Sequence, residues 1–230
     1  MKDPIVKNGG EAYENKYESG DFSFEFKFER PKFTEKIPKK IHKFYEKKLK
    51  RAESYYRDSF LHCAKKYTGK RRSEYDFPDT ILVSHKITDS CDKYISVLRK
   101  TEFFYNDRSV YVVFSEVWSL PDCRLLFIGD LSGAGYITER RLLRGVYSLC
   151  LDSVRFELYQ DLKPRLRRNL HRENVYIKDS RAYIFFQPGA LAPAKYGIIS
   201  LPLDSAIKAC SSPGKRKVKG TLNKSISAGQ

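Results

Sequence analysis

The sequence predicts an α+β domain in which a mostly antiparallel sheet packs against two long amphipathic helices. Phenylalanine occupies every second position over residues 22–28, apolar residues recur with the period of a helix over residues 37–67, and four strand-like runs follow over residues 81–128. Short turns join these runs, and strands joined by hairpins pair antiparallel. A parallel sheet is not expected, because strands and helices do not alternate regularly. We expect a single domain over residues 21–210.

The first predicted strand alternates four phenylalanines with polar residues. Successive side chains of a strand point to opposite faces, so the rings of Phe22, Phe24, Phe26 and Phe28 share one face. This face must be covered by a helix or by a sheet, because the 15 Phe of the chain cannot all stay in water. The preceding residues, 1–20, show no periodicity and are expected to form a flexible lead-in.

The first helix is expected between residues 37 and 67, where apolar residues turned by about 100° per residue fall on one stripe. The stripe consists of Ile37, Ile41, Phe44, Tyr45, Leu49, Ala52, Tyr56, Phe60, Cys63 and Tyr67. The opposite side carries Lys36, Lys39, Lys43, Lys47, Lys50 and Arg57. We therefore expect the helix to place its stripe on the core and a basic ridge toward water.

The remaining elements are predicted from shorter runs. Strands are expected over residues 81–87, 94–105, 109–120, 124–128, 175–178, 183–186 and 198–201. A second helix is expected over residues 138–162, with Pro164 limiting its end. Asp204 is placed to cap a short last helix. Residues 211–230 carry too little apolar area to fold and are expected to form a disordered basic tail.

Basic residues concentrate in two segments. The formal net charge of +16 arises mostly from residues 31–72, which hold 15 Lys and Arg against 4 Asp and Glu, and from the last twenty residues, which hold 5 Lys and Arg and no acid. A candidate polyanion site consists of Lys39, Lys43, Lys47, Lys50, Arg71 and Arg72. The same residues are also typical of a solvated face that keeps a protein soluble, and no known nucleic-acid-reading motif accompanies them.

The sequence argues against a membrane span, a cofactor and a metal site. It has no run of about 18 apolar residues and no apolar signal-peptide region, so a cytoplasmic chain is expected unless an upstream segment has been removed. The five cysteines are widely spread without a C-x-x-C pair, which is typical of free thiols. The four histidines have no ligand spacing, and Gly129, Gly133 and Gly135 do not match a phosphate-binding loop.

No catalytic residue is expected. The sequence contains no G-x-S-x-G element, no cysteine in a nucleophile context and no group of residues that meets the requirements of acid–base catalysis. We expect the helices and the phenylalanine strand to seal against the sheet without leaving a reactive pocket, and the protein is therefore expected not to be an enzyme.

Residues 174–203 read NVYIKDSRAYIFFQPGALAPAKYGIISLPL, a strand, a turn, an aliphatic-aromatic strand, a proline loop and a final strand. This segment resembles the end of the RsiV-like family, a domain of unknown function found in the anti-sigma factor RsiV and beside the catalytic domain of peptidoglycan deacetylase C. Three further segments are similar to earlier parts of that domain: residues 92–107, which include Ser96, residues 125–131, and the helix of residues 36–67. The family's Gly-Gly-x-His element and the membrane anchor of RsiV are absent.

The resemblance implies an α+β fold and a noncatalytic role in binding a protein or a cell-wall-related ligand. Binding is expected at the sheet edge or at the family-motif loop, which carries Gln187, Pro188, Pro193, Tyr196 and Gly197. Packing of this loop against the core is the structural alternative. Two other functions remain open, nonspecific binding of nucleic acid or another polyanion through the basic helix face, and an unrecognised cell-wall-related enzyme.

Overall fold

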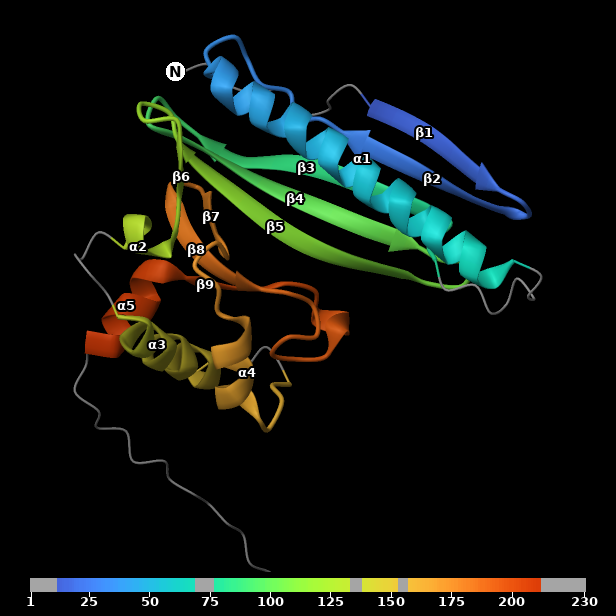
Figure 1. The fold of residues 1–230 in the computed structure, drawn as a ribbon. Coiled ribbons are helices and arrows are strands. Elements are labelled where there is room, and N and C mark those ends of the chain that lie inside the picture. Colours follow the sequence, from blue (N-terminus) through green and yellow to red (C-terminus); the bar gives the residue numbers. More distant parts are fainter. Residues whose placement is uncertain (1–11, 69–76, 133–137, 153–156, 212–230) are drawn as a thin grey trace, which may run out of the picture.

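The computed structural model describes residues 12–68, 77–132, 138–152 and 157–211 and contains two sheets. The large sheet has the order β1-β2-β3-β4-β5-β6, and the long helix α1 crosses one of its faces (Figure 1). The small sheet, of order β7-β8-β9, lies on the opposite face together with the remaining helices (Figure 1). The predicted α+β class with mostly antiparallel pairing is confirmed.

The predicted strands over residues 81–128 and 175–201 are present with bounds that differ by a few residues. The large sheet contains β1 (Ala12–Ser19), β2 (Phe22–Glu29), β3 (Thr80–Ser90), β4 (Tyr94–Phe104), β5 (Ser109–Ser119) and β6 (Arg124–Leu126). The small sheet contains β7 (Val175–Lys178), β8 (Arg181–Phe186) and β9 (Ile199–Pro202). The helices are α1 (Lys39–Tyr67), α2 (Ile128–Leu131), α3 (Glu139–Asp152), α4 (Leu162–Asn169) and α5 (Leu203–Ser211). Among the described strands, β2 and β3 are the one parallel pair, because α1 returns the chain across the sheet between them.

The alternating phenylalanines form the core beneath α1, as predicted. Phe24, Phe26 and Phe28 are at most 1% exposed and pack with Leu49 and Phe60 of the helix. The ring centres of Phe24 and Phe60 lie 4.9 Å apart. Because full burial of one such side chain contributes about 1.5–3 kcal/mol, this face of β2 holds α1 on the sheet.

The N-terminal segment differs from the flexible lead-in expected over residues 1–20. It contains β1, which pairs with β2 along its whole length. A turn at Gly20, whose φ is 60°, joins the two strands. The hydroxyl groups of Tyr13 and Tyr17 both donate to the Glu53 carboxylate of α1, the former over 2.6 Å. Glu53 lies 36 to 40 residues from these tyrosines, so the local pattern of β1 does not indicate this contact.

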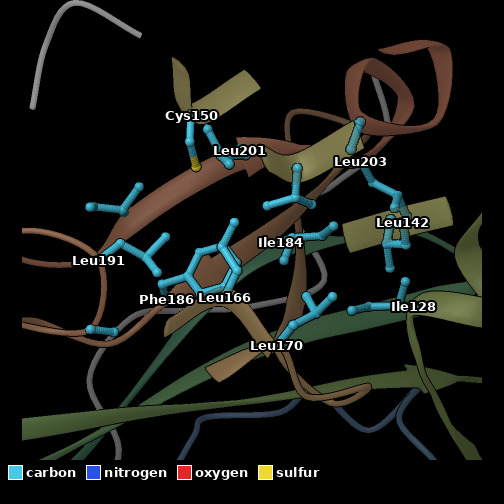
Figure 2. Packing of buried hydrophobic residues seen from close by; sticks show 14 of the residues in the cluster. Ile128, Leu142, Cys150, Leu166, Leu170, Ile184, Phe186, Leu191, Leu201 and Leu203 are labelled. Carbon is cyan, nitrogen blue, oxygen red and sulfur yellow. The ribbon is translucent and has the colours of Figure 1, made fainter. Parts of the chain in front are cut away.

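The second long helix is expected over residues 138–162, but α3 ends at Asp152 and a separate helix, α4, begins at Leu162. Residues 157–161 are not helical, and Pro164 lies in the first turn of α4, where a proline needs no hydrogen-bond partner for the missing N–H. These helices cover the small sheet rather than the large one. Together with α5 they enclose a second core, whose buried members include Leu142, Leu166, Ile184 and Phe186 (Figure 2).

Hydrogen bonds between side chains of the large sheet and the backbone of β7 join the two sheets. The buried Ser96 hydroxyl accepts the N–H of Ile177 over 2.9 Å and the hydroxyl of Thr88 over 2.9 Å. The Ser115 hydroxyl donates to the carbonyl oxygen of Val175. The pattern predicted one sheet, and two result because β7 lies across β3, β4 and β5 instead of pairing at an edge.

The C-terminal helix α5 ends at Ser211, so nearly all of the tail expected over residues 211–230 lies outside the described residues. Among the helices of the described part of the chain, none is both long and apolar enough to cross a membrane.

We expect Ser96→Ala to lower the free energy of unfolding by about 1–3 kcal/mol, because the N–H of Ile177 loses its acceptor inside the core. Urea denaturation followed by circular dichroism measures the change. Ser109→Ala, at an exposed position of β5, is the control and should change it by less than about 0.5 kcal/mol. Equal effects of the two substitutions would show that Ser96 does not hold the sheets together.

Candidate functional site

A buried carboxylate lies between α1 and the large sheet. Glu116 of β5 is 3% exposed and forms an ion pair with the ammonium group of Lys48 of α1. The Nε atom of Arg99 of β4 lies 3.7 Å from its Oε1 atom, and the hydroxyl of Tyr45 donates to its Oε2 atom over 3.4 Å. The interface between α1 and the large sheet therefore contains a paired ionisable group as well as the apolar stripe expected from the sequence.

The positions of these side chains in the local sequence explain why they meet. Lys48 follows Ile41 by seven residues, so it lies on the inward stripe of the helix and not on the basic ridge. Glu116 alternates with Trp118 of β5, whose ring is buried on the face that α1 covers. A charged residue at an inward position of each element was the signal that could have indicated the pair.

Burial changes the proton affinity of the groups around this carboxylate. Loss of water lowers the pKa of Lys48, and the charge of Glu116 opposes that shift. Burial and the neighbouring carboxylate together raise the pKa of Tyr45 well above its usual value. In the same layer, burial lowers the pKa of His85 to about 4, although its Nδ1 atom hydrogen-bonds the carbonyl oxygen of Glu29 over 2.7 Å.

A pocket of about 290 Å³ opens beside this carboxylate, at the edge of β5. We call it the β5-edge pocket. It is lined by Phe44 and Lys48 of α1, Arg99 of β4, residues 114–117 of β5, residues 125–127 and residues 172–174. The lining therefore comes from both parts of the fold, because residues 172–174, which lead into the small sheet, form one wall of the pocket.

The edge of β5 is covered by different groups along its length. β6 pairs with β5 only from Val117 to Ser119. Further along, the side-chain amide of Gln187 accepts the N–H of Val113 over 2.9 Å and donates to its carbonyl oxygen. In an antiparallel strand every second residue points its backbone N–H and C=O groups toward the same side. The outward-facing N–H and C=O groups of Ser115 therefore lie between those of Val113 and Val117, beside the pocket that Ser115 lines.

Exposed apolar side chains follow the same edge. Phe114 is 43% exposed and Val110 is 49% exposed, on the face of β5 that carries Glu116. The guanidinium carbon of Arg99 lies 4.1 Å from the centre of the Phe114 ring, which holds the ring in one place at the mouth of the pocket.

The family-motif loop lies partly at this edge. Gln187 binds Val113, and a Cβ atom added to Gly197, whose φ is 67°, would lie 3.3 Å from the hydroxyl of Tyr111 of β5. Pro188 and Pro193 are half-buried, and Tyr196 packs on the core of the small sheet. The two binding surfaces expected from the sequence, the sheet edge and the loop, thus meet at β5.

The candidate polyanion residues on α1 lie where the sequence places them. Lys39, Lys43, Lys47 and Lys50 are exposed on the helix. The other two members, Arg71 and Arg72, lie outside the described residues. In the described ranges, no three His, Cys, Asp or Glu side chains gather in a way that could hold a metal ion.

We expect Glu116→Leu alone to lower the free energy of unfolding by about 1–3 kcal/mol, because Lys48 keeps a half-buried charge without its partner. The double variant Lys48→Met/Glu116→Leu should lose less than Glu116→Leu alone. Urea denaturation of both single variants and the double variant gives the coupling energy. Strictly additive losses would contradict a direct interaction between the two side chains.

We expect the free energy of unfolding to fall as the pH is lowered from 6.5 toward 4, in part because of His85. Within this range the imidazole of His85 binds a proton in the unfolded chain but stays neutral in the folded chain. This difference lowers the free energy of unfolding by about 2 kcal/mol at pH 4.5. His85→Asn keeps a donor for the Glu29 carbonyl oxygen and cannot titrate. Between pH 7.5 and pH 4.5, the free energy of unfolding of His85→Asn, measured with urea, should fall by about 2 kcal/mol less than that of the parent. Equal losses in the two proteins would rule out His85 as the cause.

No model of a protein family matches the sequence, and no curated protein matches it. Solved structures are similar to it. A DUF3298 family protein from Pseudomonas aeruginosa PAO1 aligns with a TM-score of 0.53 at 11% identity, over 87% of this chain and 91% of the other. A DUF3298 family member from Bacteroides fragilis NCTC 9343 aligns with a TM-score of 0.45 at 9% identity, over 85% and 91%. The first of these likenesses shows that the chain has the fold of a DUF3298 family protein.

Proposed function

We propose that this chain is a noncatalytic binding domain of the RsiV-like type that recognises a short extended segment of a partner protein at the β5-edge pocket. The observation that carries the proposal is a pocket at an interruption in the cover of a sheet edge, with the exposed ring of Phe114 at its mouth. An edge strand offers backbone groups to an incoming segment, and a neighbouring pocket selects one of its side chains.

The arrangement of polar groups supports a single extended segment. Gln187 already occupies the outward groups of Val113, and β6 occupies those from Val117 onward. A partner segment therefore finds one free position, at Ser115, and turns away on either side. The pocket itself takes one side chain, because its volume of about 290 Å³ lies at the lower end of the range for ligand sites.

The chemistry of the lining favours binding over catalysis. The Ser115 hydroxyl donates to the carbonyl oxygens of Glu173 and Val175, which cannot serve as general bases. The carboxylate of Glu116 is held by Lys48 and Tyr45. These groups satisfy one another, so they can orient a bound segment without offering a free nucleophile.

The exposed aromatic ring supports the same role. Aromatic and arginine side chains carry much of the binding energy in protein interfaces, and Phe114 and Arg99 form such a pair at the pocket. Pre-stacking of the two side chains limits the conformational freedom that a partner must remove.

Selection of peptides from a random display library on the immobilised full chain tests the proposal. Selected peptides should bind Phe114→Ala about 10- to 100-fold more weakly than the parent, as expected for loss of an aromatic anchor. Leu61→Ala is the matched control, because Leu61 is 39% exposed on α1 and lies outside the pocket. Hydrogen exchange should show added protection of the Ser115 amide in the complex.

Failure to select any peptide, or selected peptides that protect another surface and bind Phe114→Ala normally, would contradict the proposal. Binding of isolated peptidoglycan that does not depend on Phe114 would instead favour a cell-wall ligand at a different place.

A second candidate, polyanion binding, is favoured by the four exposed lysines on one face of α1. Their simultaneous replacement by glutamine should then abolish binding to duplex DNA or heparin at low salt, and the affinity of the parent should fall steeply as salt is added. If the parent binds neither polyanion at low salt, this candidate fails while the β5-edge proposal is unaffected.

A further inference from the structure

A second concave surface lies between α3 and α4, away from the β5-edge pocket. It has a volume of about 940 Å³, and we call it the α3–α4 groove. Arg140 and Arg144, one helical turn apart on α3, and Lys163 and Arg167, one turn apart on α4, line it. All four side chains are exposed.

The positive charge of this groove is not neutralised within the described part of the chain. No described carboxylate forms an ion pair with any of the four basic residues, and Glu139 is the one acidic residue among the described lining residues. The neighbouring Arg165 of α4 differs, because its Nε atom lies 2.6 Å from Asp161. A cleft lined by charges of one sign focuses its field and attracts a ligand of the opposite sign.

The groove also has an apolar component. Leu143 and Tyr147 of α3 line it between the two basic rows, and the ammonium group of Lys163 lies 5.1 Å from the centre of the Tyr147 ring. A small inorganic anion would leave these side chains uncovered. A nucleic acid would use the charges but has no aliphatic side chains to place against Leu143.

The C-terminal tail of this chain does not suit the groove. Residues 211–230 hold 5 Lys and Arg and no acid, so they would meet four basic side chains with like charge. The charge of the groove complements an acidic segment instead.

We propose that the α3–α4 groove binds an acidic amphipathic segment of a partner protein, with carboxylates on the two basic rows and apolar side chains on Leu143 and Tyr147. Carboxylates spaced one helical turn apart on the partner would match Arg140 and Arg144. The surface is separate from the β5-edge pocket, so the two proposals stand or fall independently.

Fluorescence anisotropy with designed peptides tests the proposal on the full chain. The probe is a labelled 18-residue helical peptide with glutamates on one face and leucines on the other. Two control probes are a peptide of the same charge with serine in place of leucine, and an 18-nucleotide oligo(dT). The amphipathic peptide should bind best, and binding by Arg144→Glu/Arg167→Glu should be at least about tenfold weaker.

The matched control is Lys86→Glu/Lys93→Glu, which makes the same change of charge at exposed positions outside the groove and outside the lysine face of α1, and should leave affinity for the peptide within about twofold. The neutral variant Arg144→Gln/Arg167→Gln should show an intermediate loss. Equal weakening by the control would show attraction by net charge alone and overturn the proposal. Equal binding of the serine peptide, or preferential binding of oligo(dT), would also overturn it.

Discussion

The two parts of this molecule are held in one arrangement by hydrogen bonds from side chains of one sheet to the backbone of the other. Ser96 accepts the N–H of Ile177 inside the interface, and Gln187 binds both backbone groups of Val113. A backbone group buried without a partner is costly, so an alternative placement of the small sheet would leave these groups unsatisfied. The wall of the β5-edge pocket formed by residues 172–174 depends on this placement.

The buried ion pair adds a second constraint on the opposite face of the large sheet. Replacing such a pair by apolar residues is often neutral for stability, so its presence between α1 and β5 does not by itself explain the stability of the helix. The phenylalanine face of β2 provides that stability through burial of apolar area. Lys48 and Glu116 instead join one position of the helix to one position of the sheet, and they give the pocket a polar wall.

The β5-edge pocket, the α3–α4 groove and the lysine face of α1 differ in charge and shape. The β5-edge pocket contains the ion pair of Lys48 with Glu116, and an aromatic ring at its mouth. The α3–α4 groove contains basic side chains without described acidic partners. The lysines of α1 lie on a helix face exposed to water, where each charge is screened more strongly than in a concave site. Much of the excess charge of the chain can therefore serve solubility, while the groove is the place where charge and shape coincide.

Periodicity in the sequence determined most of the elements, because the face that each residue occupies follows from the local repeat. The four phenylalanines of β2, the apolar stripe of α1 and the hairpins of β3 to β6 could all be predicted in this way. Local repeats do not identify distant partners. The tyrosines of β1 bind Glu53, the segment between α3 and α4 bonds to Leu191 through the N–H of Tyr159, and Lys48 pairs with Glu116. Only the tertiary structure decided that Gln187 of the family-motif loop covers the edge of β5, because a side chain finds a backbone 74 residues away only after both sheets have packed.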